Sequence, residues 1–126
     1  MNRLKARFKH NCCTTLKHTK ILAEKKMRYA AVEGGGTTWV CAIAVDDVDN
    51  FVERAEFVTS DPVTTLGQVR AWLNEQKFDA IGVGSFGPID ARIGSPTFGY
   101  ITSTPKKLWA NTNVLDLIGL NGEFKG

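Results

Sequence analysis

Three glycines followed by two threonines are the residues of this sequence whose types and spacing most suggest chemistry. Gly34, Gly35 and Gly36 precede Thr37 and Thr38, and apolar segments flank the run on both sides. Glycine lets a backbone approach a ligand closely and adopts angles that other residues avoid. Successive amides in such a turn can enclose an anion, and threonine hydroxyls add donors. The run therefore predicts a phosphate-binding turn, with an ordinary glycine-rich hairpin as the alternative.

This turn differs from two common phosphate-binding motifs. It contains no G-x-x-x-x-G-K-[ST], and the residues after it have the pattern of a strand, whereas a Walker loop leads into a helix. The G-x-G-x-x-G spacing of dinucleotide-binding turns is also absent. Any phosphate contact at this position is therefore expected to come from a turn between two antiparallel strands.

A second glycine-rich turn contains Ser85, Phe86, Gly87 and Pro88, and Asp90 follows it. Ligands of α/β sheets collect beyond the carboxyl ends of the strands, so we expect this turn to face the same cleft as the first. A plain Gly-Pro turn is the alternative. Asp90 is a possible general base, although we favour an exposed turn aspartate.

Hydroxyl and amine groups gather in a third segment, residues 100–107. Thr104 and Lys106 lie there, among other threonine, serine and lysine side chains. Such groups suit a polyol or a phosphate, and they suit a surface loop equally well. The segment is thus a candidate substrate loop.

The elements expected to position these segments form an α/β unit of the order β-β-β-α-β. Asp61 is a suitable N-cap and Pro62 a suitable first residue for the helix, whose apolar face would contain Val63, Leu66 and Leu73. A helix that leads into a buried strand suggests a crossover to a parallel neighbour. The predicted strands are residues 28–33, 38–45, 51–59 and 79–84, the helix runs from 62 to 77, and a short helix covers 113–120.

Charge divides the sequence of 126 residues into two parts. Residues 1–26 carry eight Lys and Arg against one acid, whereas residues 27–126 carry eight against twelve. We predict a basic, disordered leader at 1–26 and one domain at 27–126, and we favour Met27 as the true start. A transit peptide or a nucleic-acid tail are alternatives for the leader. The acidic remainder gives no electrostatic reason to expect nucleic-acid binding.

The three cysteines indicate a reducing compartment. Cys12 and Cys13 are adjacent and do not have zinc-site spacing, and Cys41 lies in an apolar run that predicts a buried thiol. An odd cysteine count without a secretory signal argues against disulfides. No apolar run approaches the ~20 residues of a membrane helix. We therefore expect a cytoplasmic protein without membrane partners.

Together, the three segments resemble the start of the bacterial-type fructokinases of the ROK family, which belong to the actin/hexokinase-like ATPase superfamily. The similar motifs are Glu-Gly-Gly-Gly-Thr at 33–37, Gly-Val-Gly-Ser-Phe-Gly-Pro-Ile-Asp at 82–90 and Phe-Gly-Tyr-Ile-Thr-Ser-Thr-Pro-Lys at 98–106. The resemblance covers about residues 27–118. It implies a ribonuclease H-like β-β-β-α-β lobe and transfer of a phosphoryl group from ATP, with Mg²⁺, to the 6-hydroxyl of fructose.

The resemblance also implies roles for individual residues. Gly35, Gly36, Thr37 and Thr38 would match the turn at the ATP phosphates, and Glu33 would match the acidic position near the metal. The sugar would contact two loops. Its predicted contacts are Ser85, Phe86, Gly87, Pro88, Thr104 and Lys106.

Two departures from the family pattern bear on activity. Thr38 stands where the family usually has a lysine, which removes a positive charge beside the phosphates. The family's catalytic base is an aspartate on the strand after the Asn113 helix, and the sequence ends at Gly126 before such a segment. We therefore expect a truncated N-terminal lobe that is inactive alone and assign no catalytic residue.

Other function classes remain open at this stage. The chain could be a non-catalytic domain that binds a sugar or phosphate, or it could pair with a separate C-terminal half or a second copy. A ROK-type repressor is a further alternative, but residues 1–26 show no helix-turn-helix pattern. The pattern favours fructose, with other hexoses as alternatives.

Overall fold

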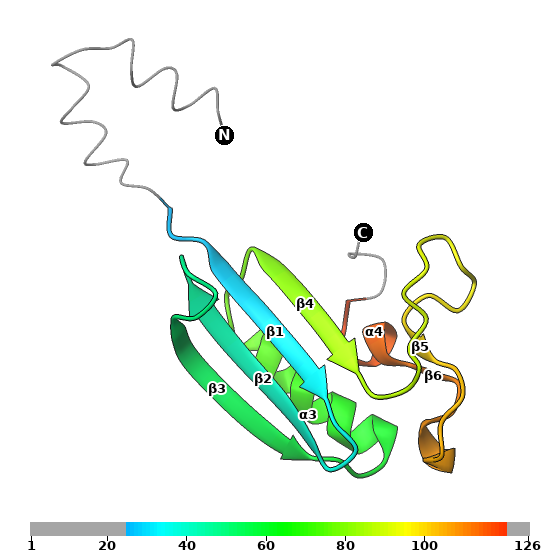
Figure 1. The fold of residues 1–126 in the computed structure, drawn as a ribbon. Helices are drawn as coiled ribbons and strands as arrows, with labels where there is room; N and C mark the ends of the chain where they lie inside the picture. Colours follow the sequence, from blue (N-terminus) through cyan, green and yellow to red (C-terminus); the bar gives the residue numbers. More distant parts are fainter. Residues whose placement is uncertain (1–24, 121–126) are drawn as a thin grey trace, which may run out of the picture.

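A four-stranded mixed sheet forms the centre of the part that the structure describes, residues 25–120 of a computed structural model. Its strand order is β3-β2-β1-β4 (Figure 1). The strands are β1 (Arg28–Gly34), β2 (Thr38–Val45), β3 (Phe51–Val58) and β4 (Ala80–Ser85). The predictions for residues 1–24, including Cys12 and Cys13, and for the tail 121–126 lie outside the described residues.

Strand directions place the ends of β1 and β4 at one edge of the sheet. β1 and β2 are antiparallel, with Gly34 opposite Trp39, and β2 and β3 are also antiparallel. β4 runs parallel to β1, with Gly34 opposite Ser85. The predicted β-β-β-α-β order and the parallel crossover are therefore confirmed, and the sheet and helix form a mixed α/β arrangement.

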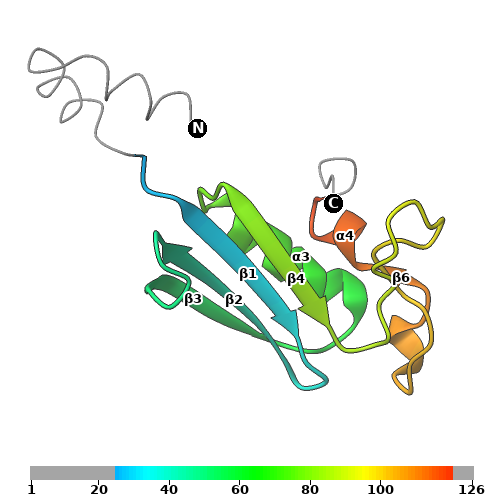
Figure 2. The same ribbon diagram turned by 45° about the horizontal axis from the view of Figure 1, so that its top comes forward.

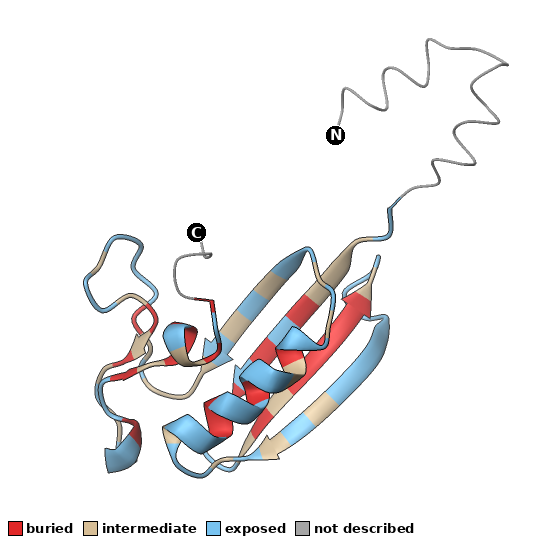
Figure 3. Ribbon diagram, turned by 180° about the vertical axis from the view of Figure 1, so that it is seen from behind, coloured by how far each residue is buried: buried red, intermediate tan, exposed pale blue. Residues whose placement is uncertain are grey.

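Helix α3 (Pro62–Asn74) covers one face of the sheet (Figures 1 and 3). It begins as predicted, because the Asp61 carboxylate accepts a hydrogen bond of 2.9 Å from the Thr64 amide and Pro62 occupies the first turn. Leu66 and Leu73 are buried as expected. The prediction for Val63 is wrong: this residue is 70% exposed, because the buried face of the helix consists of Thr65, Leu66, Val69 and Leu73.

The chain after β4 forms a second layer of short elements beside the sheet (Figure 2). β5 (Tyr100–Ile101) pairs with β6 (Thr112–Asn113), which the sequence did not predict. Between them lies the 3₁₀ helix η1 (Lys107–Trp109). The helix predicted at 113–120 is shorter, α4 (Val114–Leu117), because Gly119 adopts φ 85° and turns the chain.

The core lies between the sheet and α3. Trp39, Cys41 and Ile43 are fully buried, as alternate residues of one strand face are expected to be. Burial raises the pKa of the Cys41 thiol to about 11, so the predicted core thiol is confirmed and stays protonated at neutral pH. Within residues 25–120, no helix has the length and apolar character needed to cross a bilayer.

The packing of α3 predicts the effect of shortening one core side chain. Leu66→Ala should lower the free energy of unfolding by about 2–5 kcal/mol, because Leu66 is fully buried against the sheet. Val63→Ala in the same helix should change it by less than about 0.5 kcal/mol. Urea titration followed by tryptophan fluorescence measures both, and equal losses would contradict the packing described.

Candidate functional site

The two glycine-rich turns lie side by side at one edge of the sheet (Figures 1 and 2). The Phe86 amide donates a hydrogen bond of 2.7 Å to the Gly34 carbonyl, so the pairing of β1 and β4 continues into the second turn. The parallel crossover causes this arrangement, since parallel strands end at the same edge. The two turns are therefore adjacent, and a common cleft between them stays a prediction.

The third predicted segment reaches the same place. The Lys106 side chain crosses Gly36, with its Cε 3.3 Å from where a Cβ on Gly36 would lie. The Trp109 indole N–H donates a hydrogen bond of 2.8 Å to the Ser60 carbonyl and ties η1 to the end of β3. A hollow of about 230 Å³ lies here, lined by Ser60, Lys106, Lys107, Leu108 and Trp109.

Three aromatic rings pack against one another and connect the first turn, the second turn and η1. Trp39 stacks on Trp109 with ring centroids 5.6 Å apart and an interplanar angle of 16°. Phe86 places its edge against both, at 6.3 Å from Trp39 and 5.2 Å from Trp109. Phe86 was predicted to border the sugar, whereas its ring packs in this cluster. The first turn, the second turn and η1 therefore share one rigid support.

The packing of the Trp39 ring against the first turn requires a glycine at position 34. A Cβ at this position would lie 2.4–2.6 Å from atoms of the Trp39 ring, a distance that real side chains do not tolerate. Unusual backbone angles are not the reason for the glycines of this turn. Among the described residues, the glycines with positive φ are Gly94, Gly99 and Gly119. Of the two reasons for glycine that the sequence suggested, close approach and unusual backbone angles, close approach of neighbouring atoms applies to the first turn.

The first turn presents free backbone donors. The Gly35 amide is used within the hairpin, donating to the Thr38 carbonyl at 2.9 Å. Thr59 fixes the turn from the end of β3, because its hydroxyl donates to the Gly35 carbonyl at 2.8 Å. Among the described residues, the amides of Gly36 and Thr37 have no hydrogen-bond partner. Two neighbouring exposed amides are a suitable partner for an anion.

The polar groups of the two predicted sugar loops bond mostly within those loops. The Ser85 hydroxyl donates to the Phe86 carbonyl at 2.8 Å, and the Thr104 hydroxyl accepts from the Lys106 amide at 3.2 Å. The Pro88 carbonyl accepts from the Thr102 amide at 3.0 Å, which joins the two loops. Gly87 lies in the same turn. The structure thus brings the predicted residues together at one edge of the sheet.

Glu33, the predicted metal ligand, is exposed near the end of β1, opposite Gly84 of β4. Within residues 25–120 there is no group of three or more His, Cys, Asp or Glu side chains that could hold a metal ion. A single carboxylate fits Mg²⁺, because this ion commonly takes one or two protein carboxylates and completes its shell with phosphates and water.

Asp90 is buried, so the prediction of an exposed turn aspartate is wrong. Arg92 binds it with two side-chain hydrogen bonds, from Nε to Oδ1 and from Nη2 to Oδ2, each 2.9 Å long. The Ser95 and Thr97 hydroxyls each donate to Oδ2 at 2.6 Å. The carboxylate therefore closes the loop of residues 90–99.

These contacts also make Asp90 unsuited to accept a proton. The Arg92 guanidinium, followed by the two hydroxyls, holds the pKa of the Asp90 carboxyl far below its usual range. A general base needs a pKa nearer the working pH. The only signal in the sequence was the spacing Asp90-x-Arg92-x-x-Ser95-x-Thr97, which places short-range partners around one carboxylate.

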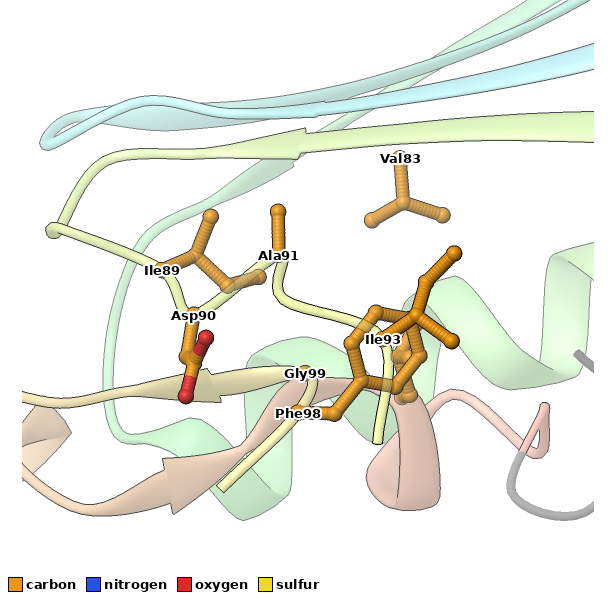
Figure 4. A pocket seen from close by; sticks show the side chains of 8 residues that line it. Val83, Ile89, Asp90, Ala91, Ile93, Phe98 and Gly99 are labelled. Carbon is orange, nitrogen blue, oxygen red and sulfur yellow. The ribbon is translucent and has the colours of Figure 1, made fainter. Parts of the chain in front are cut away.

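An apolar hollow of about 190 Å³ lies next to this loop, and Ile89, the residue after the second glycine-rich turn, is part of its lining (Figure 4). Val83 of β4 faces Ile93 and Phe98 across it, and Leu115 of α4 also contributes. Its lining side chains are apolar except for Asp90, whose carboxylate is already bound by Arg92, Ser95 and Thr97, so the hollow offers few polar groups to a sugar or a phosphate. The site that the predicted residues form is therefore at the glycine-rich edge.

Comparison with known proteins agrees with the motifs at that edge. The chain is 45% identical over 87 residues to a fructokinase of Lactococcus lactis subsp. cremoris, a match that covers 69% of this chain and 30% of the relative. It is 41% identical over 92 residues to a fructokinase of Streptococcus mutans, covering 71% and 31%. This chain is homologous to part of the fructokinases.

The homologous region is consistent with an N-terminal fragment of a fructokinase, and the chain spans about 30% of the length of these relatives. A glucokinase of Pyrobaculum calidifontis is also similar, with 42% identity over 60 residues that cover 47% of this chain and 19% of the relative. No family model matches the chain. Because these relatives are named fructokinase and glucokinase, the sugar-kinase relationship expected from the motifs is confirmed.

A substitution at Gly34 tests how the Trp39 ring packs against the first turn of this fructokinase homologue. Gly34→Ala should lower the free energy of unfolding by about 1–3 kcal/mol, because the new methyl group would overlap the Trp39 ring. Gly82→Ala in β4 is the matched control, since no atom lies within 4 Å of its added methyl group. Urea titration measures both variants. A Gly34→Ala variant as stable as the control would contradict the packing.

The hydrogen bonds to Asp90 predict that the free energy of unfolding decreases at acidic pH. The folded-state pKa of Asp90 lies below its unfolded value of about 3.9, so its stabilisation is present above pH 4 and declines as the pH falls below that. Asp90→Asn should be less stable than the original chain at pH 7, and the difference should shrink toward pH 3. Urea titrations across this range measure it, and a pH-independent difference would contradict the prediction.

Proposed function

We propose that this chain is the N-terminal lobe of an ATP-dependent fructokinase that transfers a phosphoryl group to the 6-hydroxyl of fructose. The observation that carries the proposal is the meeting of three segments at one sheet edge. The turn of residues 34–38, the loop of residues 85–88 and Lys106 lie together there. The fold assigned under this proposal is ribonuclease H-like, as the family resemblance implies, and the mixed sheet with its parallel crossover is compatible with it.

In this proposal the first turn receives the ATP phosphates. The free amides of Gly36 and Thr37 would donate to phosphate oxygens, with Gly35 and Thr38 holding the turn in shape. Phosphoryl transfer depends mainly on positioning and on stabilising charge, and fixed backbone donors provide both. Glu33 would help to hold Mg²⁺, which supplies charge neutralisation on the phosphates when it is bound.

The sugar would lie against the second turn and the segment that follows β5. Ser85, Gly87 and Pro88 would border it on one side, and Thr104 and Lys106 on the other. Phe86 contributes indirectly, because its ring fixes the second turn on the aromatic cluster. Hydroxyl, amine and backbone groups of this kind suit a polyol, and they orient its 6-hydroxyl toward the phosphate turn.

The proton of that hydroxyl requires an acceptor that we do not assign within residues 25–120. The Asp90 carboxylate is bound by Arg92, Ser95 and Thr97 and is a poor base. A positioned general base contributes about 10²–10⁴-fold to a rate. The isolated chain is therefore proposed to bind ligands without measurable turnover, in a reducing, cytoplasmic environment.

The test is an assay for fructose 6-phosphate with the purified 126-residue chain, ATP, Mg²⁺ and fructose, using the Lactococcus lactis fructokinase as the positive control. We expect no product from the chain alone and product after addition of the remaining part of that relative. Fructose titration followed by NMR should perturb the amides of Ser85 and Gly87.

Two results would contradict this proposal. Turnover by the chain alone would show that a described carboxylate acts as the base. Absence of any fructose-dependent shift would remove the sugar site from this edge. Fructose binding without restored activity would favour the alternative of a non-catalytic binding domain.

A further inference from the structure

Lys106 belongs to a sugar-side loop, yet its side chain lies over the phosphate turn. Its Cε is 3.3 Å from the position of a Cβ on Gly36, and among the three glycines of the turn only Gly36 is met by a charged side chain. Gly36 and Lys106 are far apart in the sequence, so the tertiary fold creates this contact. A larger residue at position 36 would occupy the space that the lysine side chain uses.

The charges around the phosphate turn indicate a role for the contact between Lys106 and Gly36. Residues 34–38 carry no charged side chain, and the exposed Glu33 precedes them. A carboxylate beside two amides opposes the approach of a phosphate, because like charges repel. Apart from the Mg²⁺ proposed at Glu33, the turn itself supplies no positive group to a polyphosphate at Gly36 and Thr37, and Lys106 brings an ammonium group to that place from another segment.

We propose that Lys106 binds the phosphoryl group that is transferred, at the junction between the phosphate turn and the sugar loop. This assignment rests on the proposed function and refines the sugar-binding role predicted for Lys106. The transferred group lies between ATP and the sugar, so a side chain that joins the two loops lies beside it. An ammonium there stabilises the charge on the phosphoryl oxygens as the group moves.

The backbone of Lys106 is held in place by its own segment. Its backbone amide donates to the Thr104 hydroxyl at 3.2 Å, and η1 begins at the next residue. η1 is held by the stacked Trp109 and by its hydrogen bond to the Ser60 carbonyl. The aromatic cluster that positions the two glycine-rich turns therefore also sets the start of the Lys106 side chain.

Lys107 provides a matched control. It is the next residue, it carries the same charge and exposure, and it lines the same hollow beside Ser60 and Trp109. No atom of Lys107 is among the close neighbours of Gly36. A general attraction of anions to two lysines would thus affect both positions, whereas the proposed contact is specific to Lys106.

The experiment is a titration of the full 126-residue chain with inorganic tripolyphosphate, read from the amide NMR shifts of Gly36 and Thr37. Lys106→Met should weaken binding by about tenfold or more, as expected for loss of a charged hydrogen bond. Lys106→Arg should retain most of the affinity, and Lys107→Met should change it by less than about threefold. Both lysines are exposed, so the variants should fold.

Several outcomes would overturn this assignment. They are an equal loss of tripolyphosphate affinity in Lys106→Met and Lys107→Met, no loss of affinity in Lys106→Met, or no tripolyphosphate binding at Gly36 and Thr37 in the original chain. A parallel fructose titration, read at Ser85 and Gly87, separates this failure from that of the proposed function. If tripolyphosphate and fructose both bind the original chain, only the role of Lys106 fails. If fructose alone binds, the phosphate turn of the proposed function fails as well, and if neither ligand binds, both proposals fail.

Discussion

The stacked contact between Trp39 and Trp109 is the interaction on which the candidate site depends. It joins the start of β2 to η1, two segments that are distant in the sequence, and Phe86 adds the turn after β4. Aromatic pairs contribute about 0.5–1.5 kcal/mol beyond the burial of their surface. The Trp39 indole N–H is buried without a hydrogen-bond partner among the described residues, so ring packing alone holds this side chain.

This support explains how a small lobe can present backbone donors to a ligand. Gly34 allows the Trp39 ring to lie directly against the first turn, and the sheet fixes the second turn beside it through the amide of Phe86. The amides of Gly36 and Thr37 then project from a rigid base without competing partners. Preorganised donors of this kind stabilise charge more effectively than groups that must first reorient.

Asp90 illustrates how a carboxylate near a site can have a structural role. Its position after a glycine-rich turn suggested either a base or a solvated side chain. The fold instead surrounds it with Arg92, Ser95 and Thr97, which keeps it ionised and closes the loop that leads into β5. This loop carries the chain back toward the sheet edge, where Thr104 and Lys106 lie.

The sequence by itself determined the order of β1, β2, β3, α3 and β4 and the sugar-kinase relationship, because these depend on local hydrophobic period, capping and contiguous motifs. Asp61, Pro62 and the alternation through Cys41 are signals of this local kind. Only the tertiary structure decided the pairing of β5 with β6, the burial of Asp90 and the crossing of Lys106 over Gly36. The strand pairing and the Lys106 contact join residues of different elements, and the side chains around Asp90 meet because the loop of residues 90–99 folds back on itself. Hydrophobic period and capping do not specify these contacts.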